Sequence, residues 1–521
     1  MNNKILNNRF TILYFIPFII GSLSVFSFQP FNFTIVNFFI LPTFFYLLIF
    51  IKKRSKSTYR KKPYKKNLFI FGTAFGFGFF LSGIYWITNS LTFDENFRIF
   101  IPFGLILIPL FLSLFFSLPT LMIGPYLNLK FSSILLFAGS FAFSDYLRSK
   151  ILSGFPWNLW SYSFSWALEI IQILNIIGLF AFNLISITLF LIPIILFFKI
   201  GIIKKLISIL FLTLFLFLFY IYGNYSINLN QKYLSNTNDK FNVKVVSPNL
   251  MLEYGLGKKE INERLDKLIR YSSPQKNIKT LFVWPEGVFS GYSYNEVTEF
   301  KNKFSKYFDN NHYILFGINR FSESHNRFFN SLIIVNNKFE ILQEYKKQKL
   351  VPFGEFLPFE NFLNKFGLKK ITEGHGSYLK GTNQKNLLLD NLNILPLICY
   401  EIIFSEFIQQ SNNSTNLIIN ISEDGWFGDS IGPHQHFAKA IFRSVEHNSF
   451  LLRSANKGIS AIINNKGEVL KKLQLNEAGN IELEVPLIKS KNKTKNDLIF
   501  FVLLITYIFI FINFYKKNNV K

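Results

Sequence analysis

Three stretches of this chain share one design, an apolar run of strand length that ends abruptly in polar residues. Two of them lead to Glu286 and Cys399, and the third is the run 418–428. Reactive groups gather at strand ends in α/β sheets, because the sheet fixes the backbone while the side chains point into a crevice. A fourth segment, 344–358, adds three lysines and Glu355 beside a Pro–Phe–Gly turn. Together these segments could supply a nucleophile, a base and a cation.

Cys399 is the only cysteine in the sequence, so neither an intramolecular disulfide nor a cysteine-based zinc site can form. Its thiol becomes a strong nucleophile only as a thiolate, which requires a nearby base or cation. Glu286 could accept the proton, and a lysine could stabilise the thiolate and later the oxyanion of a tetrahedral intermediate. A lone cysteine is more commonly a buried structural residue. The residues alone leave both interpretations open.

Three histidines, His434, His436 and His447, lie in a stretch whose pattern predicts a helix over 434–454. No carboxylate–histidine signature of a metal site, such as His-Glu-x-x-His, accompanies them. We therefore predict positions on the helix surface or behind the reacting groups for these side chains, and we expect neither a metal nor another cofactor.

The composition is that of a membrane protein with one soluble part. Of 521 residues, 50% are hydrophobic, 18% are aromatic and 17% are charged, against about 25% charged in soluble domains. These values exclude disordered, collagen-like and disulfide-rich secreted proteins. The net charge of +25 is typical of nucleic-acid-binding proteins. Since the lysines occur in a chain that is also rich in Asn, Ile and Phe, compositional drift accounts for the charge, and we expect no nucleic acid partner.

Eight apolar stretches are long enough to cross a hydrocarbon layer of about 30 Å as helices. They cover roughly residues 11–28, 32–51, 68–90, 99–123, 132–148, 168–198, 203–223 and 498–515. The close glycines of 76–83 lie inside a span, so we expect helix packing there and not nucleotide binding. The predicted division is a membrane domain (1–223) with seven spans, a polar domain (224–496), and an eighth span with a tail (497–521).

Lysines and arginines in the short loops predict the orientation. The segment 52–66 carries nine of them and is expected in the cytoplasm. With seven spans ahead of it, the polar domain then lies on the outer side of the membrane. Four lysines between 489 and 495 favour the opposite side, but long domains translocate largely regardless of charge.

The polar domain alternates predicted strands and helices, which is typical of an α/β layered sandwich with strands buried on both faces. The predicted strands are 242–247, 280–284, 313–318, 331–337, 392–398 and 416–421. The predicted helices are 259–271 and 434–454. A hairpin over 461–470 is expected to turn at Asn465–Gly467.

Four motifs in this order, WPEG, YKKQKLVPFGE, ICYE and ISEDGWFG, resemble the catalytic domain of bacterial apolipoprotein N-acyltransferases, a nitrilase-type domain. In the membrane part, FQPFN, GFGFFLSGIYWITNSL and DYLRSKILSGFPW resemble motifs of the same family. The resemblance covers nearly the whole chain, and the ordered set is far more specific than any single motif. It implies a membrane bundle of about eight α-helical spans that carries a nitrilase-like αββα sandwich.

The resemblance implies a catalytic triad of Glu286 as proton acceptor, Lys347 as stabiliser of the thiolate and oxyanion, and Cys399 as nucleophile. Further residues matched to the family's pattern are the supporting residues Glu355, Tyr400, Glu401, Trp284 and Asn330.

The register of the motif selects one lysine. In the family the catalytic lysine lies two residues after a Tyr and three before a Leu, and Tyr345 and Leu350 therefore select Lys347. Lys346 and Lys349 would be solvated charges or would face lipid headgroups.

Two departures from the family's pattern lie outside the triad. Asp145 stands where a Glu is expected before Arg148, and SEDGWFG replaces the commoner SNDAWFG-like run. Arg148 could contact lipid headgroups or pair with Asp145, and the residues leave this open.

The apolar residues that follow the lysine segment predict a lid near the membrane through which acyl chains enter sideways. We expect the side chains of this lid to be exposed: Phe353, Phe356, Leu357, Phe359, Phe362, Leu363, Phe366 and Leu368. Trp426 and Phe427 add an aromatic pair. An ordinary core helix would also account for the run.

The activity that the resemblance implies is transfer of a fatty acyl chain from a membrane phospholipid to the α-amino group of the N-terminal S-diacylglyceryl-cysteine of an apolipoprotein, through a thioester on Cys399. The implied partners are the phospholipid donor, the diacylglyceryl-apolipoprotein acceptor and membrane lipid. The implied location is the bacterial inner membrane, with the catalytic domain on the periplasmic side.

Two other functions stay open. A membrane-tethered nitrilase-like amidase would hydrolyse small amides with the same triad, but it leaves the spans and the apolar lid unexplained. A transporter with an outer regulatory domain would need ionisable residues inside the spans, and the sequence has almost none there.

Overall fold

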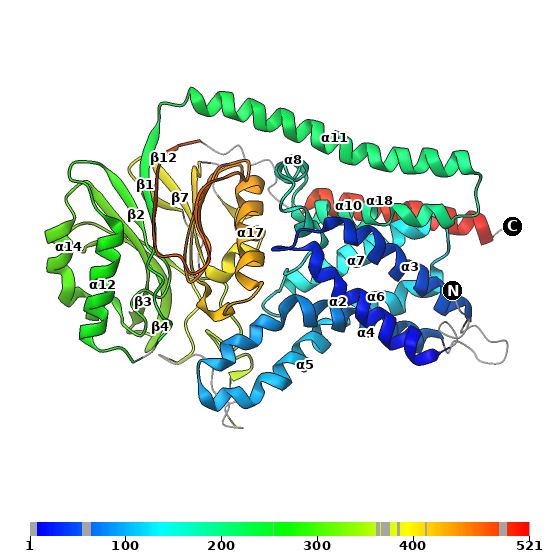
Figure 1. Cartoon of the computed structure of the whole chain (residues 1–521), viewed down its shortest axis with the longest axis horizontal. Coiled ribbons are helices and arrows are strands. Elements are labelled where there is room, and N and C mark those ends of the chain that lie inside the picture. The colour runs from blue at the N-terminus through cyan, green and yellow to red at the C-terminus, as the bar shows by residue number, and fades with distance from the viewer. Residues whose placement is uncertain are drawn as a thin grey trace. The chain divides into compact units, whose positions relative to one another are not determined.

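The computed structural model of the chain describes residues 8–54, 64–253, 255–360, 365, 376–382, 386–411, 414–488 and 497–519. The chain divides into two compact units (Figure 1). One consists of Met1–Tyr225 with Asn496–Lys521, and the other of Ser226–Lys495.

The first unit is helical. Its main helices are α2 (Ile16–Leu23), α3 (Asn37–Arg54), α4 (Tyr64–Ile84), α5 (Ile101–Leu112), α6 (Leu114–Ile123), α7 (Phe131–Lys150), α10 (Leu179–Phe190), α11 (Ile202–Ser235, whose last residues belong to the second unit) and α18 (Leu498–Asn519). Two single turns, α8 (Leu168–Ile171) and α9 (Leu174–Ile177), precede α10.

Six helical stretches in the described part of the chain are long and apolar enough to cross a membrane, so the expected count of about eight is not confirmed. They are Thr34–Arg54, Tyr64–Thr92, Glu95–Tyr126, Leu179–Phe197, Ile202–Ser235 and Leu498–Tyr515. Thr11–Ser27 is apolar but shorter. The helix α7 is not among the six, since its serines, Asp145 and Arg148 lower its hydropathy. A single span over 168–198 is wrong, because Gly178, with φ +77°, separates α9 from α10.

The glycines of α4 pack this helix against its neighbours, as the sequence predicts. A Cβ atom on Gly78 would lie 2.2 Å from the backbone oxygen of Phe18 in α2. Toward another neighbour, a Cβ on Gly72 would lie 2.2 Å from Oγ1 of Thr120 in α6. Only glycine permits backbones this close, which is a common device in membrane helices.

The open question about Arg148 is resolved in favour of pairing. Its Nη2 donates to Oδ1 of Asp145 at 2.8 Å, and Nη1 donates to the backbone oxygens of Phe155 and Trp157 at 2.5 and 2.7 Å. The other oxygen of Asp145 accepts from Nδ2 of Asn183 at 2.9 Å. The buried ion pair therefore ties α7 to α10 and to the segment that follows α7.

The second unit contains two six-stranded sheets. The first has the order β12-β1-β2-β3-β4-β5, with strands β12 (Gly479–Pro486), β1 (Lys240–Ser247), β2 (Thr280–Val283), β3 (His312–Ser322), β4 (Arg327–Val335) and β5 (Ile341–Lys346). The second has the order β11-β10-β9-β8-β7-β6, with strands β11 (Val469–Leu473), β10 (Ser460–Ile463), β9 (Phe450–Asn456), β8 (Leu417–Glu423), β7 (Leu392–Ile398) and β6 (Leu387–Leu389). The central strands of each sheet are parallel.

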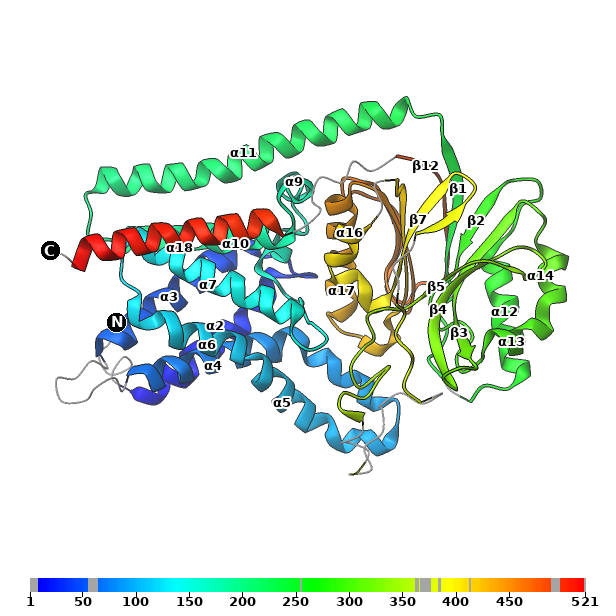
Figure 2. The same ribbon diagram turned by 180° about the vertical axis from the view of Figure 1, so that it is seen from behind.

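The two sheets pack face to face and helices cover their outer faces, which confirms the αββα sandwich. Side chains alternate along each strand, so Leu281 and Val283 of β2 enter the core between the sheets while Phe282 enters the layer behind it. On the first sheet this layer includes α12 (Lys258–Ser272) and α14 (Lys301–Tyr307) (Figure 1). On the second it includes α16 (Glu406–Gln410) and α17 (Gly432–His447) (Figure 2).

The hairpin over 461–470 is confirmed, since β10 and β11 pair antiparallel and Gly467 in the turn has φ +84°. The prediction of one helix over 434–454 is wrong for its second part. The helix ends at His447, because Asn448 adopts the left-handed conformation with φ +57°, and the apolar residues beyond it form β9, a central strand.

Candidate active site

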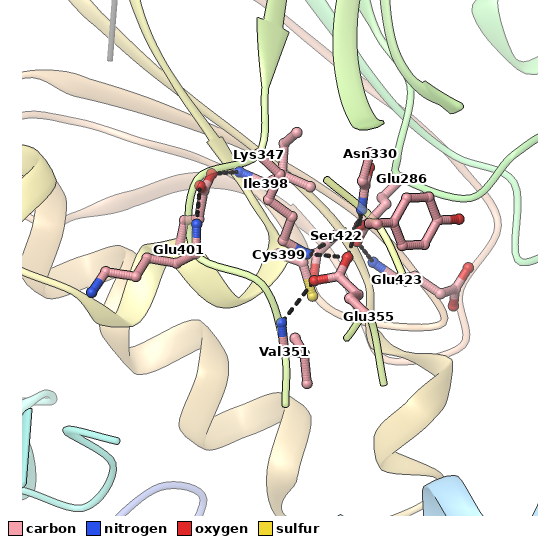
Figure 3. A network of polar contacts seen from close by, with 12 residues as sticks. Glu286, Asn330, Lys347, Val351, Glu355, Ile398, Cys399, Glu401, Ser422 and Glu423 are labelled. Atoms are coloured by element: carbon pink, nitrogen blue, oxygen red, sulfur yellow. Dashed lines mark hydrogen bonds and ion pairs between the residues drawn. The ribbon is translucent and has the colours of Figure 1, made fainter. Parts of the chain in front are cut away.

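Four chemically capable residues lie at strand ends of the second unit. Lys347 follows β5 directly, Cys399 follows β7 directly, Glu423 is the last residue of β8, and Glu286 comes shortly after β2. In Figure 3 the side chains of Glu286, Lys347 and Cys399 converge on one small region. The residues that the sequence assigned to the triad are thus brought together from both sheets.

Lys347 is shared by two carboxylates. Its Nζ lies 2.8 Å from Oε1 of Glu355 and 3.5 Å from Oε1 of Glu286, and its side chain is 1% exposed. Burial by itself lowers the pKa of the ammonium, but Glu286 and Glu355 outweigh burial and hold this pKa above its ordinary value. Lys347 is therefore a permanent cation in this site.

Asn330, on β4, holds the two carboxylates in place. Its Nδ2 donates to Oε1 of Glu286 at 2.8 Å and to Oε1 of Glu355 at 2.7 Å. The second oxygen of each acid accepts from a backbone N–H, that of Val351 at 2.8 Å for Glu355 and that of Glu423 at 3.1 Å for Glu286. Both acids are therefore oriented before any substrate arrives.

Glu401 connects the segment after Lys347 to the end of β7. Its Oε1 accepts from the Tyr345 hydroxyl at 2.9 Å and from the backbone N–H groups of Gln348 and Lys349 at 2.7 and 3.1 Å. Its Oε2 accepts from the N–H of Ile398, one residue before Cys399, at 2.8 Å. Burial raises the pKa of Glu401 to about 7. This carboxyl group accepts hydrogen bonds from the backbone next to both Lys347 and Cys399, so it acts as a clamp that holds the two segments together.

Cys399 is half-buried and adopts φ +48°, a conformation that residues other than glycine rarely take. Burial and the Glu286 carboxylate raise the pKa of its thiol, and the Lys347 ammonium offsets only part of this effect. The resting sulfur is therefore a thiol. Its activation requires a base that removes the proton as the sulfur attacks, and the Glu286 carboxylate, which interacts electrostatically with this thiol, is the candidate base.

Two residues at the site were missed by sequence reasoning. Tyr378 lies close enough to interact electrostatically with Glu355 and Glu286, its hydroxyl donates to Oδ1 of Asn319 at 3.0 Å, and burial raises its pKa. No motif could have revealed it. Glu423 is buried behind Glu286, and burial raises its pKa to about 8. Its place at the end of the third apolar strand was the available signal.

Two predicted supporting residues, Trp284 and Tyr400, and two predicted lid residues, Trp426 and Phe427, are also described by the structure. Trp284 is fully buried in the layer behind the first sheet, where its Nε1 donates to Oγ of Ser272 at 2.8 Å. The centre of the Tyr400 ring lies 5.1 Å from the centre of the Phe404 ring. Trp426 is half-buried. The centre of the Phe427 ring lies 5.3 Å from the centre of the His436 ring.

The predicted lid is only partly described. Phe353 and Phe359 are 46% and 75% exposed, and Phe356 is half-buried. Leu357 is buried at 5% exposure, so the expectation that it is exposed is wrong. The other predicted lid residues, Phe362, Leu363, Phe366 and Leu368, lie outside the described residues.

Comparisons with known proteins match two parts of the chain to family models. Residues 20–192 match the sequence model of the apolipoprotein N-acyltransferase N-terminal domain, and residues 258–490 match that of the carbon–nitrogen hydrolases. A solved carbon–nitrogen hydrolase superfamily protein from Xanthomonas campestris is similar at 14% identity with a TM-score of 0.35, over 47% of this chain and 91% of that one.

Two relatives extend the similarity over nearly the full length. An apolipoprotein N-acyltransferase of Rickettsia typhi is 32% identical over 481 residues, which cover 90% of this chain and 91% of the relative. Another, of Rhodopseudomonas palustris, is 29% identical over 490 residues, which cover 90% and 89%. This chain therefore belongs to the apolipoprotein N-acyltransferase family.

Proposed function

We propose that this chain transfers a fatty acyl group from a membrane phospholipid to the α-amino group of the N-terminal S-diacylglyceryl-cysteine of an apolipoprotein. Glu286, Lys347 and Cys399 are the catalytic residues. The observation that carries the proposal is the ion pair of Lys347 with Glu286, 3.5 Å apart, at the strand ends beside the half-buried thiol of Cys399.

In the first step Glu286 removes the thiol proton while the sulfur attacks the ester carbonyl of the phospholipid. The negative charge that develops on the carbonyl oxygen is stabilised by the ammonium of Lys347, which burial shields from water. The carbon–oxygen bond to the glycerol then breaks. Glu286 returns its proton to the departing alkoxide, lysophospholipid leaves, and a thioester remains on Cys399.

In the second step the neutral α-amino group of the acceptor attacks the thioester. Glu286 takes a proton from the nitrogen, the carbon–sulfur bond breaks, and the proton returns to the sulfur of Cys399. A thioester suits this exchange, because it retains enough reactivity for an amine while it divides one difficult reaction into two easier ones. During both steps, hydrogen bonds to Glu355 and from Asn330 keep the side chains of Lys347 and Glu286 in position.

The apolar helices of the first unit support a membrane protein. We propose that residues 1–223 and 497–521 anchor the chain in the bacterial inner membrane, and that residues 224–496 form the catalytic domain on the periplasmic side. Phe353, Phe356 and Phe359, with Trp426 and Phe427, would then contact the acyl chains. Both substrates are lipids, which accounts for an acyltransferase domain built into a membrane-embedded chain.

The experiment is to incubate the full-length protein in vesicles with a phospholipid of one defined acyl chain and to measure the mass of the peptide that contains Cys399. We expect the mass to increase by one acyl chain, and Cys399→Ala to abolish the increase. Addition of a diacylglyceryl-cysteine peptide should then remove the adduct and yield an amide.

If the chain were an amidase, the same samples would give a different result. A hydrolase would release free fatty acid or small acids, and the acceptor peptide would gain nothing. Failure of Cys399 to gain an acyl chain, or release of fatty acid without amide product, would contradict the proposed transfer.

The sidedness has its own test, because a chain with one cysteine can be labelled without ambiguity. We expect a membrane-impermeant maleimide to label Cys399 in intact spheroplasts. Labelling only after permeabilisation would contradict the periplasmic location.

A further inference from the structure

His436 lies directly behind the nucleophile, on α17, and is fully buried. Its Nε2 is 3.3 Å from the backbone oxygen of Cys399. His434, two residues earlier on the same helix, is half-buried. The ring of His436 therefore contacts the residue that carries the reactive sulfur.

Two buried charged residues hold the opposite side of the His436 ring. Its Nδ1 lies 3.0 Å from Oδ1 of Asp424 and 3.0 Å from Nη2 of Arg453. Nη2 of Arg453 also donates to Oδ2 of Asp424 at 2.7 Å. Oγ of Ser422, at the end of β8, donates to Oδ1 of Asp424 at 2.7 Å. The ring is therefore fixed by elements from the second sheet.

These contacts define the position of the ring proton. A carbonyl only accepts, so the contact with the oxygen of Cys399 requires the proton on Nε2. Nδ1 of a neutral ring then accepts from Arg453, while the nearby Oδ1 of Asp424 accepts from Ser422. Burial and the Arg453 guanidinium lower the pKa of His436 to about 4, which keeps the ring neutral near pH 7. Nε2–H is then the donor to the oxygen of Cys399.

The backbone of Cys399 needs such a restraint. Its φ of +48° lies in a region that side chains other than glycine's disfavour, and surrounding contacts must over-determine it. Glu401 holds the preceding N–H, at Ile398, from one side. The oxygen of Cys399 is held from the other side by His436.

We propose that His436 is a positioning residue of the acyl transfer: its Nε2–H donates to the backbone oxygen of Cys399 and holds this residue in the left-handed conformation that directs Sγ toward Glu286 and Lys347. This inference rests on the proposed function, because it assigns no chemistry of its own to His436. It makes Asp424 and Arg453 the residues that fix the ring and its proton.

Two amide substitutions separate this role from a purely structural one. In His436→Gln the side-chain N–H₂ stands as many bonds from Cβ as Nε2 of histidine and can still donate to the oxygen of Cys399. In His436→Asn the N–H₂ stands where Nδ1 was, and this donor is lost. His434→Gln is the matched control, because it makes the same change on the same helix away from the cluster.

The measurement is the rate at which Cys399 gains an acyl chain from phospholipid, with the midpoint of thermal unfolding recorded for every variant. We expect His436→Asn to reduce the maximal rate about tenfold to hundredfold, as for a nucleophile displaced by about 1 Å. The phospholipid concentration that gives half the maximal rate should not change, since His436 is not proposed to touch substrate. His436→Gln and His434→Gln should stay within about threefold of the natural chain.

Equal rates for His436→Asn and the natural chain, or equal losses for His436→Asn and His436→Gln, would overturn the proposal. Should His436→Asn fail to fold, His436→Phe takes its place in both comparisons, because phenylalanine keeps a ring but lacks the donor. Absence of an acyl adduct on the natural chain would instead contradict the proposed function.

Discussion

Each unit of the chain buries a basic side chain against carboxylates, and the two clusters are built differently. In the first unit Arg148 faces one acid, Asp145, and both oxygens of the acid and both terminal nitrogens of the arginine have partners. In the second unit Lys347 faces two acids, Glu286 and Glu355, and a thiol lies beside them.

The difference separates a structural cluster from a reactive one. The Arg148 pair is balanced in charge and its partners are neighbouring backbone and side-chain groups, so it fixes the segment that follows α7. The Lys347 cluster carries an excess negative charge, and its two acids are 12% and 13% exposed. Buried charge alone therefore does not identify an active site, whereas unbalanced charge beside a nucleophile does.

The strongest test of this contrast is Lys347→Met. The substitution removes the cation that is proposed to stabilise the oxyanion, and it leaves two acids without their common partner. We expect the rate of Cys399 acylation to fall about 10³-fold, which corresponds to about 4 kcal/mol in the activation free energy. The mass of the Cys399 peptide at successive times measures it. A decrease of less than tenfold would mean that Lys347 is as structural as Arg148.

Arg148→Met tests the other cluster. It leaves the buried carboxylate of Asp145 without its ionic partner, so we expect a loss of about 3 kcal/mol in the free energy of unfolding of the first unit. Thermal unfolding in detergent measures the change, and Arg98→Met, at an exposed arginine, is the control. Acylation per folded molecule should change little. A stable but inactive Arg148→Met protein would remove the contrast between the clusters.

A third kind of buried group, an ionisable side chain with neutral partners, is represented by His447. Its ring contacts the hydroxyls of Ser411 and Ser449 at 2.8 Å each, and burial lowers its pKa from 6.5 to about 4. The unfolded chain takes up a proton below pH 6.5 and the folded chain only near pH 4. Stability should therefore fall as the pH falls through this window, by about 3 kcal/mol in total.

The measurement compares the natural chain with His447→Gln by chemical unfolding at pH 7 and pH 4.5. Glutamine does not titrate, so the variant should lose less stability on acidification. His434→Gln, at the half-buried histidine, should change this pH dependence less. Identical pH dependence in His447→Gln and the natural chain would show that His447 does not contribute.

The smallest effect is expected for Lys346→Met, one residue before the proposed catalytic lysine. Lys346 is exposed, and its Nζ lies 4.2 Å from the centre of the Phe329 ring. Loss of this contact should cost about 0.5 to 1 kcal/mol of stability and leave the acylation rate within about twofold. A large loss of rate would contradict the register that selects Lys347.

Sequence reasoning succeeded where the information is local. Apolar runs that end in polar residues identified three strand ends of the site, and the resemblance to the family's motif between Tyr345 and Leu350 selected the lysine that is in fact buried. It failed where a neighbour distant in sequence decides. The helix predicted over 434–454 ends at His447, because the residues beyond it pair with β8 and β10 as a central strand.

Edge strands were missed for the same reason. β12 is paired with β1 over eight positions although about 240 residues separate them, and its half-exposed residues carry no strong strand pattern of their own. The count of spans also depended on more than length. α7 holds Asp145 and Arg148 because the two charges neutralise each other and because groups outside the helix, the backbone oxygen of Trp157 and the amide of Asn183, also bind them.

The order of the motifs, the apolar runs and the turn residues are properties of contiguous segments, and they were sufficient to predict the family and the layered domain and to single out Cys399 as the proposed nucleophile. The spatial relation of Glu286 to Lys347, 61 residues apart, arises from strand pairing within one sheet. The protonation of Cys399, the clamp at Glu401 and the contact of His436 with the nucleophile likewise depend on groups from several strands. Electrostatic and hydrogen-bond energies depend on distance and burial, and these quantities exist only once the two sheets have packed together.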